Sequence, residues 1–335
     1  MLPASLPRND HRTPATSNIP PTPPSLELRA LAEDDLEAAA PLLAERHERH
    51  RTIEPLLPEL EDPRAELASV WAAEGTSGAV AFEDGRVAGY LSGRVTESRF
   101  WGRHVWVAHA GHAARDPEVV RDLYAFAAAR WVAERARLHL ALVPAVPELV
   151  EPWLRLGFGH MQAHGIRESG GEVAPPAAGV AIRRGTLDDL AEARPLMPII
   201  WEHQRGSAAF TGMEIPSEEE YVADWEETIA DPTYTYFVGE LDGRIAGHLL
   251  MYPEEPDLAR PPGSVYLAVA ATLPDARGRG LGVALTEHAL AWAREAGYAT
   301  VHTDWRVPNL RSSRFWPRRG FRETFYRLAR QVEIG

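Results

Sequence analysis

The stretch RGRGLG, residues 277–282, lies between the apolar run VYLAVAAT and an amphipathic segment that begins at Leu281. Its three glycines allow a backbone to approach a ligand closely, and the start of a helix offers unpaired N–H groups to an anion. The spacing fits neither the dinucleotide fingerprint G-x-G-x-x-G nor the P-loop, which ends in G-K-[ST]. By itself, the stretch predicts either a flexible turn or a cradle for a pyrophosphate.

The composition is that of a soluble globular protein with 45% hydrophobic and 25% charged residues. A formal net charge of −13 argues against binding to nucleic acid or to an anionic membrane, since both need a basic surface. The absence of cysteine excludes disulfides and thiolate metal sites. With no apolar run of about 18 residues, the sequence predicts a cytoplasmic protein without a membrane partner. Its oligomeric state is left open.

The second half of the sequence repeats the first. LELRALAEDDLEAA corresponds to VAIRRGTLDDLAEA, EDGRVAGY to LDGRIAGH, and WLRLGFG to WPRRGFR, always in the same order. Two stretches rich in Pro, Gly and small residues fall outside the repeat. We therefore expect a Pro-rich disordered tail at 1–24, a first domain at 25–168, a linker at 169–179 and a second domain at 180–335.

Each copy shows the pattern of an α/β domain. Acidic residues open an amphipathic helix after the first strand, and the Asp-Gly pairs at 84–85 and 242–243 predict tight hairpins between apolar runs. The order in each copy is β-α-α-β-β-β-α-β-α-β. The predicted fold is therefore α/β, with two tandem domains that each form a mixed, mostly antiparallel sheet flanked by helices.

These elements together resemble the GCN5-related N-acetyltransferase (GNAT) superfamily. Arg277, Gly280 and Gly282 fit the family's pyrophosphate motif Q/R-x-x-G-x-G/A, and Asn309 and the F-W-x-x-x-G-F run at 315–321 fall where the family has them. The resemblance covers 180–330 closely and the fold of 26–168. The two-domain layout is similar in architecture to tandem members such as mycothiol synthase.

The resemblance implies acetyl-CoA as co-substrate and no metal. It places the pyrophosphate on backbone N–H groups of the loop and helix start, the pantetheine on the preceding strand, and the thioester beside the last helix. The loop residues are Arg277, Gly278, Arg279, Gly280, Leu281, Gly282 and Val283. The strand residues are Val269 and Ala271, and the residues that border the thioester are Asn309, Ser313 and Trp316.

Trp316 departs from the family, many of whose members have at this position a Tyr that protonates the leaving thiolate. An indole N–H is not acidic enough for this role. Three interpretations remain open: the thiolate leaves unprotonated, another group gives the proton, or the domain binds acyl-CoA without catalysis. For Trp316 itself, packing against the cofactor is the favoured interpretation.

The implied reaction is direct attack of a primary amine, of a small molecule or peptide, on the bound thioester, which needs a base for the amine proton. Asp304 is our first candidate, and His302 shares its face of the strand VHTDWR. Glu202, beside His203 after the first helix of the second copy, is another. Asp304 could instead anchor the Asn309 loop, and Glu202 could belong to a solvated helix end. A non-catalytic acyl-CoA-binding or scaffolding protein is the alternative function.

The first copy lacks the glycine loop. In its place stands WVAHAGHAARDPEVVRDLYAFAA, with Asp116, Glu118 and Asp122 near the expected helix start. Carboxylates there compete with phosphate for the helix N-terminus, so this copy is predicted to be degenerate and to have lost CoA binding. His109 and His112 could bind a metal with Asp116, but no third patterned ligand follows, and a polar loop is favoured.

Arginines gather near the C-terminus of an otherwise acidic chain. They are Arg306, Arg311, Arg314, Arg318, Arg319, Arg322, Arg327 and Arg330. They could meet the 3′-phosphate of CoA, an anionic acceptor or the acidic first half, and for most of them we expect pairing with the first half.

Overall fold

The computed structural model describes residues 26–171, 175–209 and 215–333. The strands of the first half are β1 (Glu27–Ala30), β2 (Thr76–Glu83), β3 (Arg86–Ser98), β4 (Gly102–Val107), β5 (His112–Ala114), β6 (Leu138–Pro144) and β7 (Gly159–Glu168). Its helices are α1 (Leu36–Ile53), α2 (Pro63–Trp71), α3 (Val119–Ala133) and α4 (Pro147–Arg155). The predicted tail at 1–24 lies outside the described residues.

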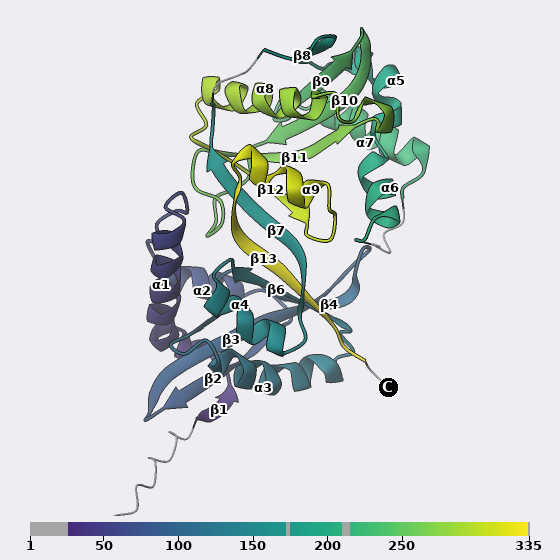
Figure 1. The fold of residues 1–335 in the computed structure, drawn as a ribbon. Coiled ribbons are helices and arrows are strands. Elements are labelled where there is room, and N and C mark those ends of the chain that lie inside the picture. The colour runs from purple at the N-terminus through teal and green to yellow at the C-terminus, as the bar shows by residue number, and fades with distance from the viewer. Residues whose placement is uncertain (1–25, 172–174, 210–214, 334–335) are drawn as a thin grey trace, which may run out of the picture.

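The second half repeats this order (Figure 1). Its strands are β8 (Val180–Arg184), β9 (Thr235–Leu241), β10 (Arg244–Tyr252), β11 (Ser264–Thr272), β12 (Thr300–Arg306) and β13 (Arg322–Gln331). Its helices are α5 (Leu190–Ala193), α6 (Ile199–Gly206), α7 (Glu218–Ala230), α8 (Leu281–Glu295) and α9 (Ser312–Phe315). Among the described residues, no helix has the length and apolarity needed to cross a membrane.

The two halves share an Arg–Asp ion pair after the first strand and an Asp-Gly hairpin turn. Arg183 makes two hydrogen bonds to Asp189, at 2.9 and 2.7 Å, where the chain leaves β8, and Arg29 pairs with Asp35 in the same way after β1. Both Asp-Gly hairpins have positive φ at their two central residues, 50° and 73° in the first half and 52° and 79° in the second. The predicted type I′ turns are thus confirmed.

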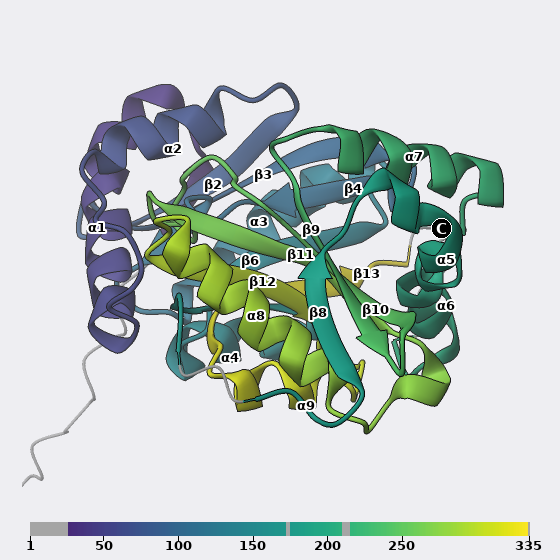
Figure 2. The same ribbon diagram turned by 90° about the horizontal axis from the view of Figure 1, so that it is seen from above.

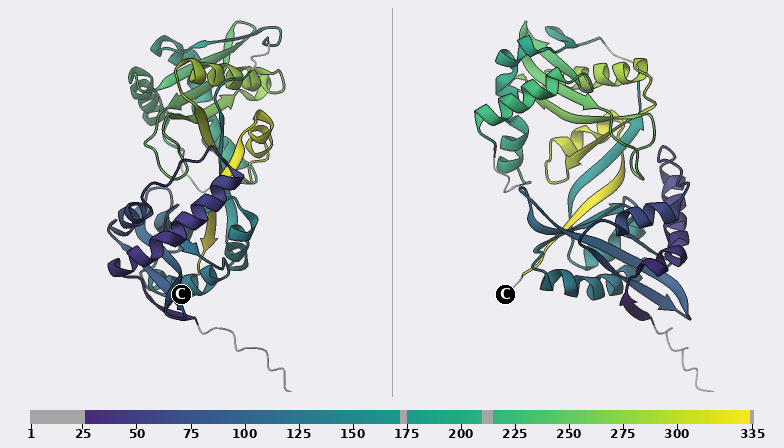
Figure 3. Two further views of the ribbon diagram at one scale, coloured as in Figure 1. Left: turned by 90° about the vertical axis from the view of Figure 1, so that its left-hand side faces the viewer. Right: turned by 180° about the vertical axis from the view of Figure 1, so that it is seen from behind.

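The strands form one continuous sheet in the order β1-β2-β3-β4-β6-β13-β7-β12-β11-β10-β9-β8, with β5 paired to β3. Only the pairs β4·β6 and β11·β12 are parallel, so the sheet is mixed and mostly antiparallel, as predicted. The last strands are exchanged between the halves: β13 pairs with β6, and β7 pairs with β12. Figure 3 shows β7 and β13 as neighbouring ribbons that run between the halves.

Helices cover both faces of the sheet in each half. In the second half, α8 crosses one face (Figure 2) and packs through Leu281 and Leu285 on Leu249, while α5, α6 and α7 cover the other face around Trp225. In the first half, α3 and α4 lie on one face, and α1 and α2 on the other. Each half therefore has two cores, one on each side of the sheet.

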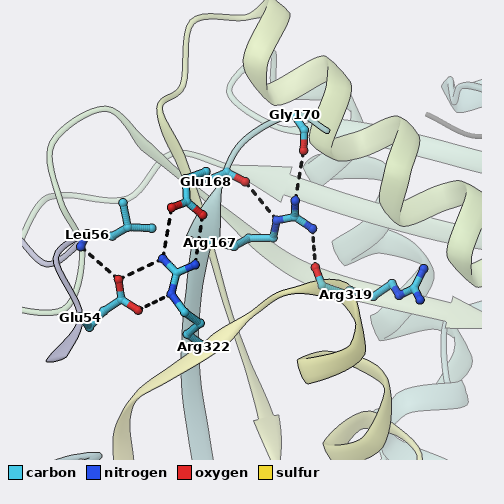
Figure 4. Close-up of polar contacts among 7 residues, drawn as sticks. All are labelled: Glu54, Leu56, Arg167, Glu168, Gly170, Arg319 and Arg322. Carbon is cyan, nitrogen blue, oxygen red and sulfur yellow. Dashed lines mark hydrogen bonds and ion pairs between the residues drawn. The ribbon is translucent and has the colours of Figure 1, made fainter. Parts of the chain in front are cut away.

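A polar network fixes the junction of the halves (Figure 4). Arg322 on β13 donates to both oxygens of Glu54, at 2.6 and 3.0 Å, and to Glu168 on β7. The hydrogen bonds from Arg322 to Glu168 hold the pKa of Glu168 below its usual value. Arg167 donates to the Gly170 and Arg319 carbonyls. Arg322 thus pairs with carboxylates of the first half, whereas Arg319 of the same arginine group pairs with Glu287 of the second half at 3.5 Å. For most of the group, pairing with the first half stays a prediction.

Candidate active site

The loop at 277–280 has a backbone that only glycine adopts readily. Gly278 has φ = 77° and Gly280 has φ = 85°, both in the left-handed region. Gly280 is the N-cap of α8, and among the described residues no side chain caps this helix and no acid lies in its first turn. The N-terminus of α8 therefore presents free N–H groups and a positive dipole end, as an anion requires.

A cavity of about 520 Å³ opens beside this loop. Its wall consists of the end of β11, the loop, the first half of α8, residues of α6 and α9, the turn before α9, and one residue of β10. Among the predicted cofactor residues, the wall includes Ala271, Arg277, Gly278, Gly280, Leu281, Gly282, Val283, Asn309 and Trp316. The loop is thus part of a cavity large enough for a ligand rather than an isolated turn.

Three other predicted residues are not on this wall. Val269 packs in the core beneath α5–α7, the exposed Arg279 donates to Asp242 at 3.2 Å, and the Ser313 hydroxyl donates to the Asn309 carbonyl at 2.9 Å. Its neighbour Ser312 takes a place on the wall instead. The cofactor role of each of these residues stays a prediction.

The part of β11 on the cavity wall, residues 270–272, lies beyond the point where β11 and β12 diverge. β11 and β12 pair from Ser264 opposite Thr300 to Leu267 opposite Thr303, and the pairing ends there. A β-bulge at this point leaves Ala268 unpaired with β10, because Leu250 faces Val269 and Met251 faces Leu267. Beyond Leu267, β11 is no longer paired with β12.

Asp304 is the first residue of β12 beyond this fork. It accepts a hydrogen bond of 2.7 Å from the Tyr266 hydroxyl, and burial together with the Asp304 charge raises the pKa of Tyr266 well above its usual value. Tyr266 therefore stays protonated and keeps donating to the carboxylate. Asp304 is not on the cavity wall; it lies at the fork on the sheet face that carries Tyr266.

The other two predicted catalytic residues are also outside the cavity wall. His302 stacks on Tyr266 and contacts Glu254 through Nε2 at 2.9 Å. Glu202 is exposed on α6, but the next residue, His203, is on the wall and donates from Nε2 to Asn309 Oδ1 at 3.0 Å. Asn309 thereby connects α6 to the turn that starts α9.

His248 on β10 is a wall residue that the sequence did not indicate. Its ring is 1% exposed and stacks on Trp225, and burial lowers its pKa to about 3, so that it is neutral. Its Nε2 is buried without a hydrogen-bond partner in the described part of the chain. A buried nitrogen of this kind on a cavity wall is available to a ligand. The sequence around His248 has the apolar pattern of an ordinary buried strand, so it gives no indication that this histidine lines a cavity.

The corresponding region of the first half has no glycine loop. Asp116 accepts a hydrogen bond of 3.0 Å from the Glu118 N–H at the start of α3, so a carboxylate already occupies that helix end. Trp153, the counterpart of Trp316, is fully buried against His112. His112 Nε2 contacts the Leu142 carbonyl, and within the described ranges no group of three or more His, Asp or Glu side chains could hold a metal.

Comparison with known proteins agrees with this geometry. Residues 199–321 match the model of the acetyltransferase (GNAT) family. The structure is similar to that of a GCN5-related N-acetyltransferase from Sphaerobacter thermophilus, with a TM-score of 0.58 and 15% identity over 92% of this chain and 96% of that chain. A search of curated proteins gave no significant match.

A second similar structure is the GCN5-related glucosamine N-acetyltransferase region of a fungal multi-domain GH3 β-N-acetylglucosaminidase. Its TM-score is 0.52 and its identity 14%, over 92% of this chain and 38% of that chain. Both halves of this α/β protein therefore have the acetyltransferase fold. Within this fold, residues 199–321 of the second half are the part of the chain that matches the GNAT family model.

Proposed function

We propose that the protein is an acetyl-CoA-dependent N-acetyltransferase whose second half, 180–335, binds the co-substrate and whose first half serves as scaffold and substrate wall. The observation that carries the proposal is the cavity of about 520 Å³ that is lined by the glycine loop, the start of α8 and the end of β11 beyond its pairing with β12. Acetyl-CoA supplies an acetyl group already activated as a thioester. The pyrophosphate would lie on the N-terminus of α8 and the pantetheine along the free edge of β11.

The residues of the chain would then act on the acceptor. The amine nitrogen attacks the thioester carbon, the C–S bond breaks, and the amine proton passes to the Asp304 carboxylate at the fork. Tyr266 holds that carboxylate in place through its 2.7 Å hydrogen bond. Trp316 has no proton to give, so we assign the proton for the departing thiolate to His203, the wall imidazole that is hydrogen-bonded to Asn309.

The test is thiol release from acetyl-CoA with a panel of primary amines that includes amino acids, peptides and glucosamine. We expect turnover with some of them, and a loss of about 100-fold or more in kcat for Asp304→Asn, the usual scale for a missing general base. Asp224→Asn, an exposed carboxylate on α7, is the matched control and should keep full activity. Full activity of Asp304→Asn would remove that residue from the mechanism.

The non-catalytic alternative rests on Trp316, which is on the wall where an acid is expected. Calorimetry separates it from the enzyme: tight binding of acetyl-CoA without turnover of any amine would favour the alternative. A stoichiometry of two CoA molecules per chain would refute the predicted loss of CoA binding in the first half.

A further inference from the structure

Arg327 on β13 contacts aromatic rings and a neutral amide among the described residues. Its guanidinium lies over the rings of Trp101 and Trp106, at 5.3 and 5.2 Å, and donates from Nη1 to Gln162 Oε1 at 2.6 Å. Its Nε is buried without a hydrogen-bond partner, and no ion pair to Arg327 occurs within the described ranges. Buried charges in proteins are normally paired, so this side chain has unused capacity for an anion.

The exchange of strands puts Arg327 on the same sheet face as Asp304. Arg327 and Arg306 both face Gln162 from either side of β7, and Asp304 faces His164 two residues away. Two strand spacings and an offset of two residues along the strand amount to about 12 Å between the backbone positions, which small molecules bridge with the help of these long side chains. Burial lowers the pKa of Arg327 to about 10 while the Asp304 charge opposes that shift, so the guanidinium is charged at neutral pH.

The first half supplies a wall beside this face. A hollow of about 300 Å³ is lined by Arg94, Thr96, Glu97, Ser98, Trp101, His104 and Trp106, all from β3, β4 and their connection. The tip of this hairpin lies near α6 and α7 of the second half (Figure 1). The pKa of Glu220 on α7 is lowered mainly by hydrogen bonds from Ser217, and the charge of Arg99 at the tip adds to this effect.

We propose that the amine acceptor also bears a carboxylate, which Arg327 binds while the amine faces Asp304. The acceptor is then an amino acid or a short peptide. The planar guanidinium fork matches a carboxylate, and the Trp101 and Trp106 rings keep that fork in a dry environment. The carboxylates of Asp304 and Glu97 repel a phosphate dianion more strongly than a monoanion. This inference rests on the proposed acetyl transfer.

The experiment compares each amino acid with its own decarboxylated amine, for example lysine with cadaverine and tyrosine with tyramine. The wild-type protein should have a higher kcat/KM for the member that keeps its carboxylate. In Arg327→Gln this preference should fall by about tenfold or more, as expected for a lost hydrogen bond between charged groups. Arg327→Lys should retain part of it, because the charge stays and the fork is lost.

The matched control is Arg330→Gln. Arg330 is on the same strand but lies over Tyr124 on the opposite face, at 5.4 Å, and its replacement should leave the preference unchanged. Thermal unfolding of each variant checks that it folds. If Arg327→Gln does not fold, Arg327→Met replaces it, because the methionine side chain keeps the packing against Trp101 and Trp106. An unchanged preference in a folded Arg327 variant, or an equal loss in Arg330→Gln, overturns the proposal.

Binding measurements test the carboxylate site even if the protein does not transfer acetyl groups. If no amine releases thiol, equilibrium binding of the amino acids to the CoA-saturated protein is followed by tryptophan fluorescence. Weaker binding to Arg327→Gln than to wild type supports the carboxylate site even then. Equal binding to both overturns it.

Discussion

Gly280 shows how a single residue decides the character of the cavity. With φ = 85° at the N-cap of α8, it turns the backbone so that the first N–H groups of the helix face the cavity. A side chain there is strained by about 1–2 kcal/mol, and a carboxylate would stand where the phosphates are expected.

We predict that Gly280→Asp lowers the affinity for acetyl-CoA by about 100-fold or more, since a like charge meets the pyrophosphate at a helix N-terminus. Isothermal titration calorimetry measures the effect. Gly297→Asp is the matched control, because Gly297 also has positive φ, 91°, but lies after the C-terminal end of α8 with open space around it. Equal loss in both variants would point to folding rather than to the cradle.

The loop was predictable at this scale because glycine encodes a positive φ directly. His248 was not predictable, since β10 lies far from the loop in sequence and only packing brings His248 to the cavity wall. The predicted roles of Asp304, His302 and Glu202 await the activity measurements.

At the scale of elements, Arg322 connects α1, β7 and β13. Its partner Glu54 has a side chain that is only 4% exposed, whereas Arg322 itself is 46% exposed. Removal of the arginine leaves a buried carboxylate without its cation, which costs more than the pair contributes.

We therefore predict that Arg322→Met lowers the free energy of unfolding by about 1–3 kcal/mol, a value reduced for the exposure of the arginine. Urea denaturation measures it. The double variant Glu54→Gln with Arg322→Met should lose less than the single one, and exposed Arg318→Met should lose almost nothing. A double variant with a lower free energy of unfolding than Arg322→Met would contradict this account.

The order of elements and the hairpins followed from the sequence because both depend on local signals, such as Asp84-Gly85 and Asp242-Gly243. The exchange of β7 and β13 did not. Both strands follow the same W-x-x-x-G-F segment and end the same repeat, so local pattern gives no preference between pairing with the own half and pairing with the other. The choice is made by long-range packing.

At the scale of the whole molecule, neutral histidines are spread through both halves. Burial lowers the pKa of each to about 3 or 4. They are His50, His109, His112, His139, His164 and His248.

We predict that stability falls as the pH drops from 6.5 toward 4. In this window the unfolded chain binds protons at these histidines with a pKa of 6.5, while the folded chain does not, so acid favours unfolding. The melting temperature should be lower at pH 5 than at pH 7.5, where these groups are neutral in both states. A melting temperature that does not change between these values would contradict the buried, neutral state.

The exchanged strands also impose an order on biosynthesis. β13 belongs between β6 and β7, yet the whole second half is translated after β7 and before β13. Until β12 and then β13 are made, β7 lacks its partner strands, and β6 keeps an open edge until β13 is made. The first half therefore cannot complete its sheet during translation, and the nascent chain presents unpaired strand edges of the kind that chaperones cover and that aggregation exploits.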